Sequence, residues 1–292
     1  MKGTVHRFLD YLQTMKGSSG HTVRGYATDI ALFEEFLGES VTLAQIDRKT
    51  IRAFIVAEHE RGVSKRSMAR RLSSLRSFFR YCLREKLLEQ SPMDGIDNPK
   101  LDRPVPHSLS YDQIERFFNL PDTSTLLGFR DRTMMELFYS SGLRVGELAG
   151  INRSDLDANE LLLLVRGKGK KERIIPVTEN AVQWIGSYLA HPDRANVQKD
   201  DHALFLNKFG RRLTTRSIDR LFALYMAKGG FAQTITPHVI RHTIATHWLE
   251  QGMDLKTIQL LLGHSSMATT TIYTEVSSDL KKRVVSSLHP RA

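Results

Sequence analysis

The chain has 292 residues, with 42 Lys+Arg against 32 Asp+Glu, a formal net charge of +10 and a pI near 9.7. This surplus favours a polyanionic partner such as nucleic acid or an anionic surface. Hydrophobic residues make up 41% of the chain, which is too many for a disordered protein. The length predicts about two domains. A single cysteine, Cys82, excludes an internal disulfide or a cysteine-based metal cage and favours a reducing, cytoplasmic setting.

We expect neither a membrane span nor a signal peptide. The longest apolar runs, residues 53–57 and 161–165, are far shorter than the ~20 residues that a span needs. Asp10 interrupts the one apolar stretch near the start. Membrane proteins are therefore excluded from the function classes considered below.

Residues 1–90 are predicted to form four helices, because apolar residues recur there at intervals of three or four. The four stripes are Val5, Phe8, Leu9 and Leu12; Tyr26, Ile30, Phe33 and Leu37; Ile51, Phe54 and Ile55; and Met68, Leu72, Leu75, Phe79 and Cys82. No strand-like alternation of useful length occurs here. Cys82 belongs to the fourth stripe, so we expect a core thiol rather than a reactive one.

The segment 61–80 is unusually basic, with seven Lys or Arg residues and no acid. A run of charge is ordinarily a solvated helix face, but such faces mix signs because like charges four apart repel each other. The pairs Arg66/Arg70 and Arg76/Arg80 accept this repulsion with no compensating acid nearby. We therefore predict phosphate contacts. The predicted DNA-binding residues here are Lys65, Arg66, Arg70, Arg71, Arg76 and Arg80.

Residues 91–106 are predicted to be a linker. Four of the nine prolines fall between residues 92 and 106, and the stretch is rich in Asp and Gly without apolar periodicity. Residues 1–105 hold 18 basic and 13 acidic residues, and residues 106–292 hold 24 and 19, so each part carries +5. Both parts could thus face the same polyanion.

Residues 107–292 predict mixed structure. Ser110 opens a capping-box helix, a second helix spans about 127–140 and ends at Gly142, and another begins around Arg144. Residues 161–177 predict a β-hairpin around a Gly-Lys-Gly-Lys turn, with Pro176 marking an edge strand. Further helices are expected at about 215–227, at 237–251 after the N-cap Thr236, and at 254–262 before a terminating glycine.

The segment TPHVIRHTIATH, residues 236–247, is the densest functional signal. His238 and Arg241 are three apart and share a helix face, and an arginine on a half-buried face usually needs an anionic partner. His238 and His242, four apart, could instead bind zinc, but the intervening glutamate is missing and an adjacent arginine repels a dication. A core histidine leaves the arginine unexplained. The predicted buried side is Ile240, Ile244, Ala245, Trp248 and Leu249.

Four other positions add weaker signals. Arg144 is placed in the first turn of a helix, where free backbone N–H groups favour an anion. Lys168 lies in a turn between two glycines, which let a ligand approach the backbone closely. His264 follows a helix-ending glycine and is by itself often only a cap, and Tyr273 is by itself usually a core residue.

Together these residues are far more specific. Arg144, Lys168, His238-x-x-Arg241, His264 and Tyr273 stand in that order over 130 residues, and this resembles the tyrosine recombinase (phage-integrase-like) family. The match is closest to the Xer group, small recombinases that resolve chromosome dimers and so serve chromosome partition and cell division. The matched segments are GLR, the GKG hairpin, PHxxRHTxATH, LLGH and TTxIYT, and a minor departure is Ile244, where the family commonly has Phe or Leu.

The resemblance covers essentially the whole chain and implies a mainly α protein with the tyrosine recombinase fold. It implies a four-helix, SAM-like core-binding domain at residues 1–90, a linker at 91–106, and an α+β catalytic domain at 107–292 with a small β-hairpin or sheet. A C-terminal exchange helix would end the chain. Its apolar stripe, Val276, Leu280, Val284 and Leu288, would pack at home or dock on another protomer, and we favour exchange because related assemblies are closed rings.

The implied reaction cleaves and rejoins DNA through a 3′-phosphotyrosine and a Holliday junction, without metal, ATP or any other cofactor. The guanidiniums of Arg144 and Arg241 can clamp the phosphate oxygens and stay charged at any working pH. Tyr273 would be the nucleophile, His238 the proton acceptor and Lys168 the acid that protonates the departing 5′ oxygen. His264 would hydrogen-bond the phosphate, and Glu147 would orient neighbours by a salt bridge.

The expected partners are a double-stranded recombination site, clamped between the two domains, and a copy of this chain or a paralogous recombinase in a cyclic tetramer. Further DNA contacts are expected at Arg211, Arg212, Arg216 and Arg220. The residues leave open the target sequence, integration of a mobile element and dependence on a septal DNA translocase. The alternatives are a non-catalytic DNA-binding or architectural protein, a metal-dependent nuclease that uses His238 and His242, and a type IB topoisomerase.

Overall fold

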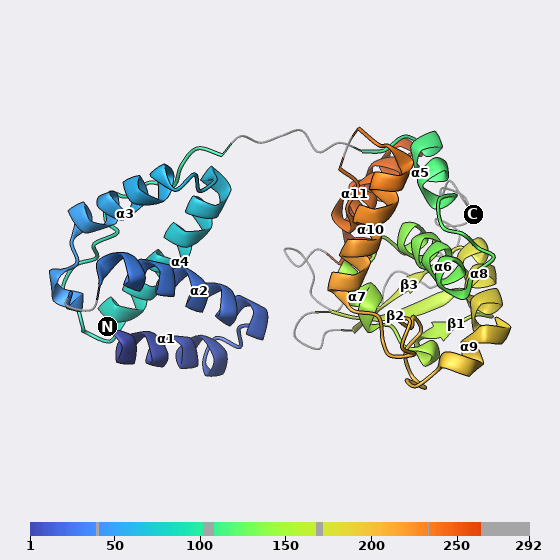
Figure 1. Ribbon diagram of the computed structural model, residues 1–292, viewed down its shortest axis with the longest axis horizontal. Coiled ribbons are helices and arrows are strands. Elements are labelled where there is room, and N and C mark those ends of the chain that lie inside the picture. Colours follow the sequence, from blue (N-terminus) through green and yellow to red (C-terminus); the bar gives the residue numbers. More distant parts are fainter. Residues whose placement is uncertain (39–40, 102–107, 168–171, 233, 264–292) are drawn as a thin grey trace. The chain divides into compact units, whose positions relative to one another are not determined.

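The computed structural model describes residues 1–38, 41–101, 108–167, 172–232 and 234–263. The chain divides into two compact units, Met1–Pro104 and Val105–Ala292, which are described separately. Figure 1 labels most of the helices and strands of each unit. None of the helices in the described part of the chain has the length and apolar character that a membrane-spanning segment needs.

The first unit is built from the four helices that the apolar stripes predict. They are α1 (Lys2–Thr14), α2 (Gly20–Leu37), α3 (Arg48–Glu60) and α4 (Lys65–Arg84), with a short 3₁₀ turn η1 (Leu43–Gln45) before α3. Side chains accept hydrogen bonds from the first backbone N–H groups at three of the starts, Ser19, Asp47 and Ser64. Local capping and tertiary burial therefore select the same helix boundaries.

The core of this unit is aromatic. Phe33 packs edge-on against Phe54 and Phe79, with ring centroids 5.1 and 6.3 Å apart, and Phe8 packs against Phe78 at 5.5 Å. Cys82 is fully buried beside them, as predicted, and burial raises the pKa of its thiol to about 11. The thiol is therefore neutral at physiological pH and acts as a small apolar side chain.

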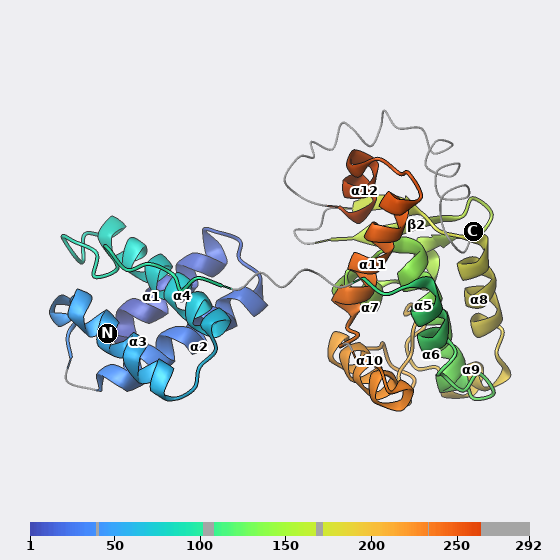
Figure 2. The ribbon, with the colours of Figure 1, turned by 90° about the horizontal axis from the view of Figure 1, so that it is seen from above.

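The second unit surrounds one buried helix, α6 (Leu126–Ser141), which packs against α5 (Tyr111–Phe118), α8 (Glu179–Leu189) and α11 (Pro237–Glu250). The other helices are α7 (Val145–Gly150), η2 (Arg153–Asp155), α9 (Pro192–Val197), α10 (Thr215–Gly229) and α12 (Leu255–Leu262). Helix α11 also contacts α10 and α12 (Figure 2). Helix α11, which carries the motif of residues 236–247, thus contacts α6, α10 and α12.

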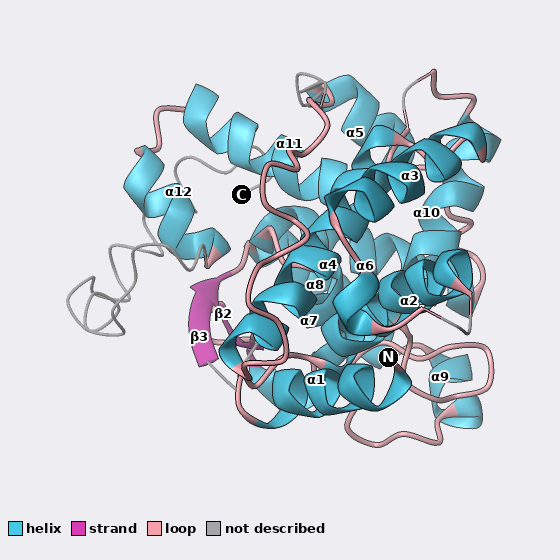
Figure 3. Cartoon of the chain, turned by 90° about the vertical axis from the view of Figure 1, so that its left-hand side faces the viewer, coloured by secondary structure: helices cyan, strands magenta, loops and turns pink. Residues whose placement is uncertain are grey.

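A small antiparallel sheet completes this unit (Figure 3). Its strands are β1 (Leu156–Asp157), β2 (Leu162–Arg166) and β3 (Glu172–Pro176), in the order β1-β2-β3, with Leu164 paired to Ile174. The expected hairpin is confirmed, and Pro176 does lie on the edge strand. The turn itself lies outside the described residues.

Several sequence expectations for this unit need correction. Strand β1 and helices α8 and α9 were not expected, although Thr178 caps α8 and its buried residues Ala181, Ile185 and Tyr188 follow helical spacing. Leu249 was expected on the buried side of α11, but the residue is 53% exposed. Helix α11 is buried through its more N-terminal apolar residues and Trp248, so the apolar stripe ends one residue earlier than predicted.

Candidate active site

Arg144 stands at the junction of α6 and α7. Helix α6 ends at Gly142, whose φ of +57° is the left-handed conformation that glycine adopts without strain. Arg144 is the N-cap of α7 rather than part of its first turn, and its backbone N–H donates to Oε2 of Glu147 over 2.9 Å. Its guanidinium Nη1 donates to Oε1 of the same carboxylate, also over 2.9 Å. Glu147 therefore orients Arg144 from both its backbone and its side chain, as the sequence predicts.

Arg241 lies between the C-terminal ends of two helices. Its Nη1 donates to the carbonyl of Gly142 after α6, and its Nη2 donates to the carbonyl of Leu262 at the end of α12, over 2.5 and 2.6 Å. Helix C-termini leave carbonyls unpaired and carry partial negative charge, so they compensate a buried cation. Arg241 is buried and only 7% exposed.

Burial lowers the pKa of the Arg241 guanidinium to about 10, and the nearby positive charge of Arg144 acts in the same direction. The group still carries its charge near neutral pH. Arg144 reaches the same helix end, because its Nη2 donates to the carbonyl of Gly263 over 2.8 Å. The structure therefore brings the two predicted phosphate-clamping arginines together at the end of α12.

A third arginine at this site was missed by the sequence analysis. Arg173 on β3 donates through Nη1 and Nη2 to Oε1 and Oε2 of Glu147, each over 2.8 Å. Its side chain is 9% exposed. The sequence offers only an arginine in a hairpin strand, and its importance depends on a carboxylate 26 residues earlier in the chain.

The carboxylate of Glu147 is strongly acidic in this setting. Burial by itself raises its pKa, but the hydrogen bonds from Arg173 and from the backbone of Arg144, with the charge of Arg173, lower the pKa to about 2. One carboxylate thus faces the guanidiniums of Arg144 and Arg173, with Arg241 close by. These four charged groups carry a net charge of about +2 at neutral pH, and such a site attracts a phosphate.

The remaining predicted catalytic residues are only partly described. His238 is exposed in the first turn of α11, three residues before Arg241, and His242 is half-buried. Lys168, His264 and Tyr273 lie outside the described residues. Within the described ranges, no group of three or more His, Cys, Asp or Glu side chains is arranged to hold a metal ion.

Comparison with known proteins decides the family. Residues 107–279 match the phage integrase family, and residues 5–86 match the N-terminal SAM-like domain of phage integrases. The chain belongs to the phage integrase family. It is similar to the tyrosine recombinase XerC of Chlamydia pneumoniae, with 48% identity over 100% of both chains, and to that of Myxococcus xanthus, with 39% identity over 99% of this chain and 98% of the relative.

These relatives show a tyrosine recombinase of the Xer group, an enzyme of site-specific DNA recombination, as predicted. Solved structures agree on the fold. A lambda integrase dimer bound to a COC′ core site has a TM-score of 0.73 at 20% identity, covering 91% of this chain and 95% of that one. The XerA recombinase has a TM-score of 0.51 at 29% identity, covering 100% and 99%. The predicted fold class is thereby confirmed.

The basic face of α4 in this recombinase is partly neutralised from neighbouring helices. Arg70 pairs with Asp29 of α2, with 2.6 Å between Nη1 and Oδ2, and Arg71 pairs with Glu58 of α3. The expectation that no acid compensates this segment is therefore wrong, because the acids come from elsewhere in the chain. Lys65, Arg66 and Arg80 have exposed side chains, whereas Arg76 donates to the carbonyl of Ile96 over 3.0 Å. The predicted DNA contacts themselves stay predictions.

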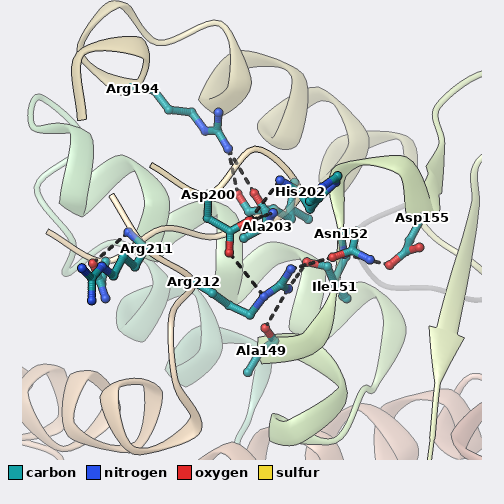
Figure 4. Close-up of polar contacts among 12 residues, drawn as sticks. Ala149, Ile151, Asn152, Asp155, Arg194, Asp200, His202, Ala203, Arg211 and Arg212 are labelled. Carbon is teal, nitrogen blue, oxygen red and sulfur yellow. Dashed lines mark hydrogen bonds and ion pairs between the residues drawn. The ribbon is translucent and has the colours of Figure 1, made fainter. Parts of the chain in front are cut away.

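The second basic cluster of the recombinase divides in a similar way. Arg212 donates to the carbonyl of Ile151 over 2.9 Å and to Oδ1 of Asn152 over 2.6 Å, and its Nε lies 3.7 Å from Asp200 (Figure 4). These contacts fix the segment before α10 to the segment after α7. Arg211, Arg216 and Arg220 are exposed. The side chain of Arg212 thus has a structural role, whatever else it contacts.

Proposed function

We propose that this recombinase cleaves duplex DNA by attack of the Tyr273 hydroxyl on a backbone phosphorus. The attack forms a 3′-phosphotyrosine and breaks the bond to the 5′ oxygen of the next nucleotide. His238 accepts the tyrosine proton, Lys168 protonates the departing 5′ oxygen, and His264 hydrogen-bonds the phosphate. A 5′-hydroxyl from a second duplex then attacks the phosphotyrosine and releases the tyrosine. Because the covalent link conserves the bond energy, no ATP is needed.

The observation that carries this proposal is the convergence of Arg144 and Arg241 at the end of α12. The non-bridging phosphate oxygens gain negative charge as the five-coordinate phosphorus forms, and fixed guanidiniums stabilise that charge most strongly when water is excluded. A tyrosine hydroxyl with an unperturbed pKa near 10 is a weak nucleophile at neutral pH, so nearby cations are also needed to favour the ionised form of Tyr273. Two preorganised arginines serve both needs.

For DNA binding, we propose that residues 1–90 and 107–292 clamp the recombination site, joined by the linker 91–106. The contacts would come from Lys65, Arg66, Arg70, Arg71, Arg76, Arg80, Arg211, Arg216 and Arg220. Arg212 would mainly hold the fold, because its guanidinium donates to Ile151 and Asn152. Arg66, Arg80, Arg211, Arg216 and Arg220 are exposed, which supports this role. Partnered arginines such as Arg70 would use the donors that their carboxylates leave available.

For assembly, we propose a cyclic tetramer on DNA, formed with further copies of this chain or with a paralogous recombinase through the C-terminal helix. A lambda integrase tetramer bound to a Holliday junction, which has a TM-score of 0.71 at 20% identity and covers 93% of this chain and 76% of that one, supports the proposal. We further propose that the recombinase works in the cytoplasm and resolves chromosome dimers, in line with its XerC relatives. A septal DNA translocase is a further partner that we propose for that role.

A suicide substrate tests the chemistry. The wild-type chain would first select a duplex from a random-sequence pool, and copies of that duplex would carry single nicks at successive phosphates. We expect a covalent protein–DNA adduct with one nick position, also in EDTA, and no adduct with Tyr273→Phe. An adduct that persists in Tyr273→Phe, or that EDTA abolishes, would contradict the proposal. Binding with no adduct at any nick would instead favour a non-catalytic DNA-binding protein.

A further inference from the structure

Arg173 and Arg144 share one carboxylate. Arg173 donates to both oxygens of Glu147 over 2.8 Å, and the same oxygens accept from the backbone and the guanidinium of Arg144 over 2.9 Å. Such a paired contact between guanidinium and carboxylate fixes direction as well as distance. The orientation of the Glu147 carboxylate, and hence of Arg144, therefore depends on Arg173.

The charges lead to the same conclusion. If Glu147 faced Arg144 alone, the pair would be neutral and Arg144 would offer little net attraction to a phosphate. Arg173 supplies the second positive charge, so that the carboxylate can hold Arg144 without cancelling it. The side chain of Arg144 is 46% exposed, whereas those of Arg173 and Glu147 are 9% and 5% exposed. The accessible arginine is thus available to a ligand, and the two buried groups support it.

Arg173 also lies against the end of α12. Gly263 has a φ of +65°, and a Cβ at this position would be only 3.0 Å from Cζ and Nε of Arg173. The carbonyl of the same glycine accepts the second hydrogen bond of Arg144. From β3, the second strand of the hairpin, Arg173 therefore holds one group that orients Arg144 and lies beside the residue that carries the other.

We propose that Arg173 is a positioning residue of the active site. It acts through Glu147 to aim Arg144 at the scissile phosphate, and it leaves the positive charge of Arg144 uncancelled. The proposal rests on the phosphotyrosine reaction proposed above. It adds to that reaction a residue that does not touch the DNA. Because the duplex is held by many other basic residues, its effect should appear mainly in the rate of strand cleavage and little in the affinity for the duplex.

The test measures adduct formation on the nicked suicide duplex, under single-turnover conditions at saturating protein. We expect Arg173→Met to slow the adduct about 10²-fold, as a misplaced catalytic group does, with the Kd for the unnicked duplex within about twofold of wild type. Arg173→Lys should recover part of the rate, about 10-fold below wild type, because an ammonium keeps the charge but loses the two parallel hydrogen bonds. This variant also keeps the test informative if Arg173→Met folds poorly.

Arg166→Met is the matched control. Arg166 lies on β2 of the same hairpin and pairs with Asp155 and Glu172, away from Glu147. Its loss should change the cleavage rate by less than about twofold. An equal slowing by the two Met variants would overturn the inference, because general weakening of the hairpin would then be sufficient.

The route through Glu147 is tested by a double-mutant cycle. In a Glu147→Gln background, adding Arg173→Met should slow the adduct by less than about threefold, since the group through which Arg173 acts is already lost. The same 10²-fold loss in both backgrounds would overturn the inference. A wild-type chain that forms no adduct refutes the phosphotyrosine reaction itself, and wild-type cleavage rates in Arg173→Met refute only the role of Arg173.

Discussion

Protonation of Glu147 should destabilise the second unit, and Glu147→Gln provides the comparison that isolates this effect. The folded-state pKa of this carboxyl is about 2, against an ordinary value of 4.5. Burial by itself raises the pKa, but the hydrogen bonds from Arg173 and from the backbone of Arg144 lower it by more. The side chain is 5% exposed, so solvent screens the contacts little. The difference between the two pKa values corresponds to ~3 kcal/mol of unfolding free energy.

The direction of the pH effect follows from the depressed pKa. A carboxyl that is more acidic in the folded state than in the unfolded state stabilises the fold fully above its unfolded pKa, and this stabilisation is lost as the pH falls toward the folded pKa. For Glu147 the window lies between about 4.5 and about 2. The wild type should therefore exceed Glu147→Gln in stability at pH 6, and the difference should shrink by ~3 kcal/mol as the pH approaches 2.

Tryptophan fluorescence during urea unfolding gives a reading confined to the second unit, because the chain's 2 tryptophans, at positions 184 and 248, both lie in it. Glu179→Gln is the matched control, since Glu179 is exposed at the start of α8. Its effect should stay within about 0.5 kcal/mol across the pH range. A wild-type advantage over Glu147→Gln that is constant from pH 6 to pH 3 would refute the reasoning, because the carboxylate would then not be the acceptor that holds the two arginines.

Three further predictions concern other parts of the chain. Gly210→Ala should destabilise the second unit by more than ~3 kcal/mol, because the φ of Gly210 is +75° and a Cβ there would overlap the last carbonyl oxygen of α9. Gly230 has a φ of +59° but faces open space, so Gly230→Ala should cost only ~1–2 kcal/mol. Burial raises the pKa of the Cys82 thiol to about 11, so Cys82 should react with iodoacetamide at pH 8 only when urea unfolds the first unit. Arg211→Ala should lower the salt slope of duplex binding by about one, whereas Arg212→Ala should mainly lower stability.

Each of these has an outcome that contradicts it. Equal costs for the two glycine variants would mean that backbone conformation alone, and not the neighbouring carbonyl, sets the penalty. Rapid alkylation of the native chain would show that the thiol is accessible. A reduced salt slope in Arg212→Ala with full stability would assign the phosphate contact to the arginine that the structure ties down. Fluorescence unfolding and salt titration of duplex binding supply all the readings except the alkylation rate.

Local signals account for what the sequence predicts well. Ser110 and Thr236 cap α5 and α11 as expected, because an N-cap depends on a side chain and a backbone N–H only three residues apart. The hairpin and the four helices of residues 1–90 likewise follow from spacing within one element. Helix α8 shows the same kind of signal and could have been predicted from it.

Tertiary pairing accounts for what the sequence does not predict. Arg70 stands 41 residues from the acid that neutralises it, and Arg173 stands 26 residues from Glu147. No single helix or strand contains both members of either pair. The motifs locate Arg144 and Arg241 because they resemble a family, but only the fold shows that Arg241 donates to the last carbonyl of α12 and Arg144 to the carbonyl of its C-cap, Gly263.

Uncompensated charge therefore has to be counted in space and not along the chain. At Asp29, one carboxylate meets one guanidinium, and Arg70 contributes little net charge although it lies in a segment without acids. At Glu147, one carboxylate meets two guanidiniums, so positive charge remains although an acid stands three residues from Arg144. Glu58 likewise meets two guanidiniums, those of Arg61 and Arg71, so the segment that looks most basic in sequence is neutralised at Asp29 but keeps positive charge at Glu58. A net charge of +10 can indicate the partner, but the ratio of guanidiniums to carboxylates at each buried acid indicates where a phosphate would bind.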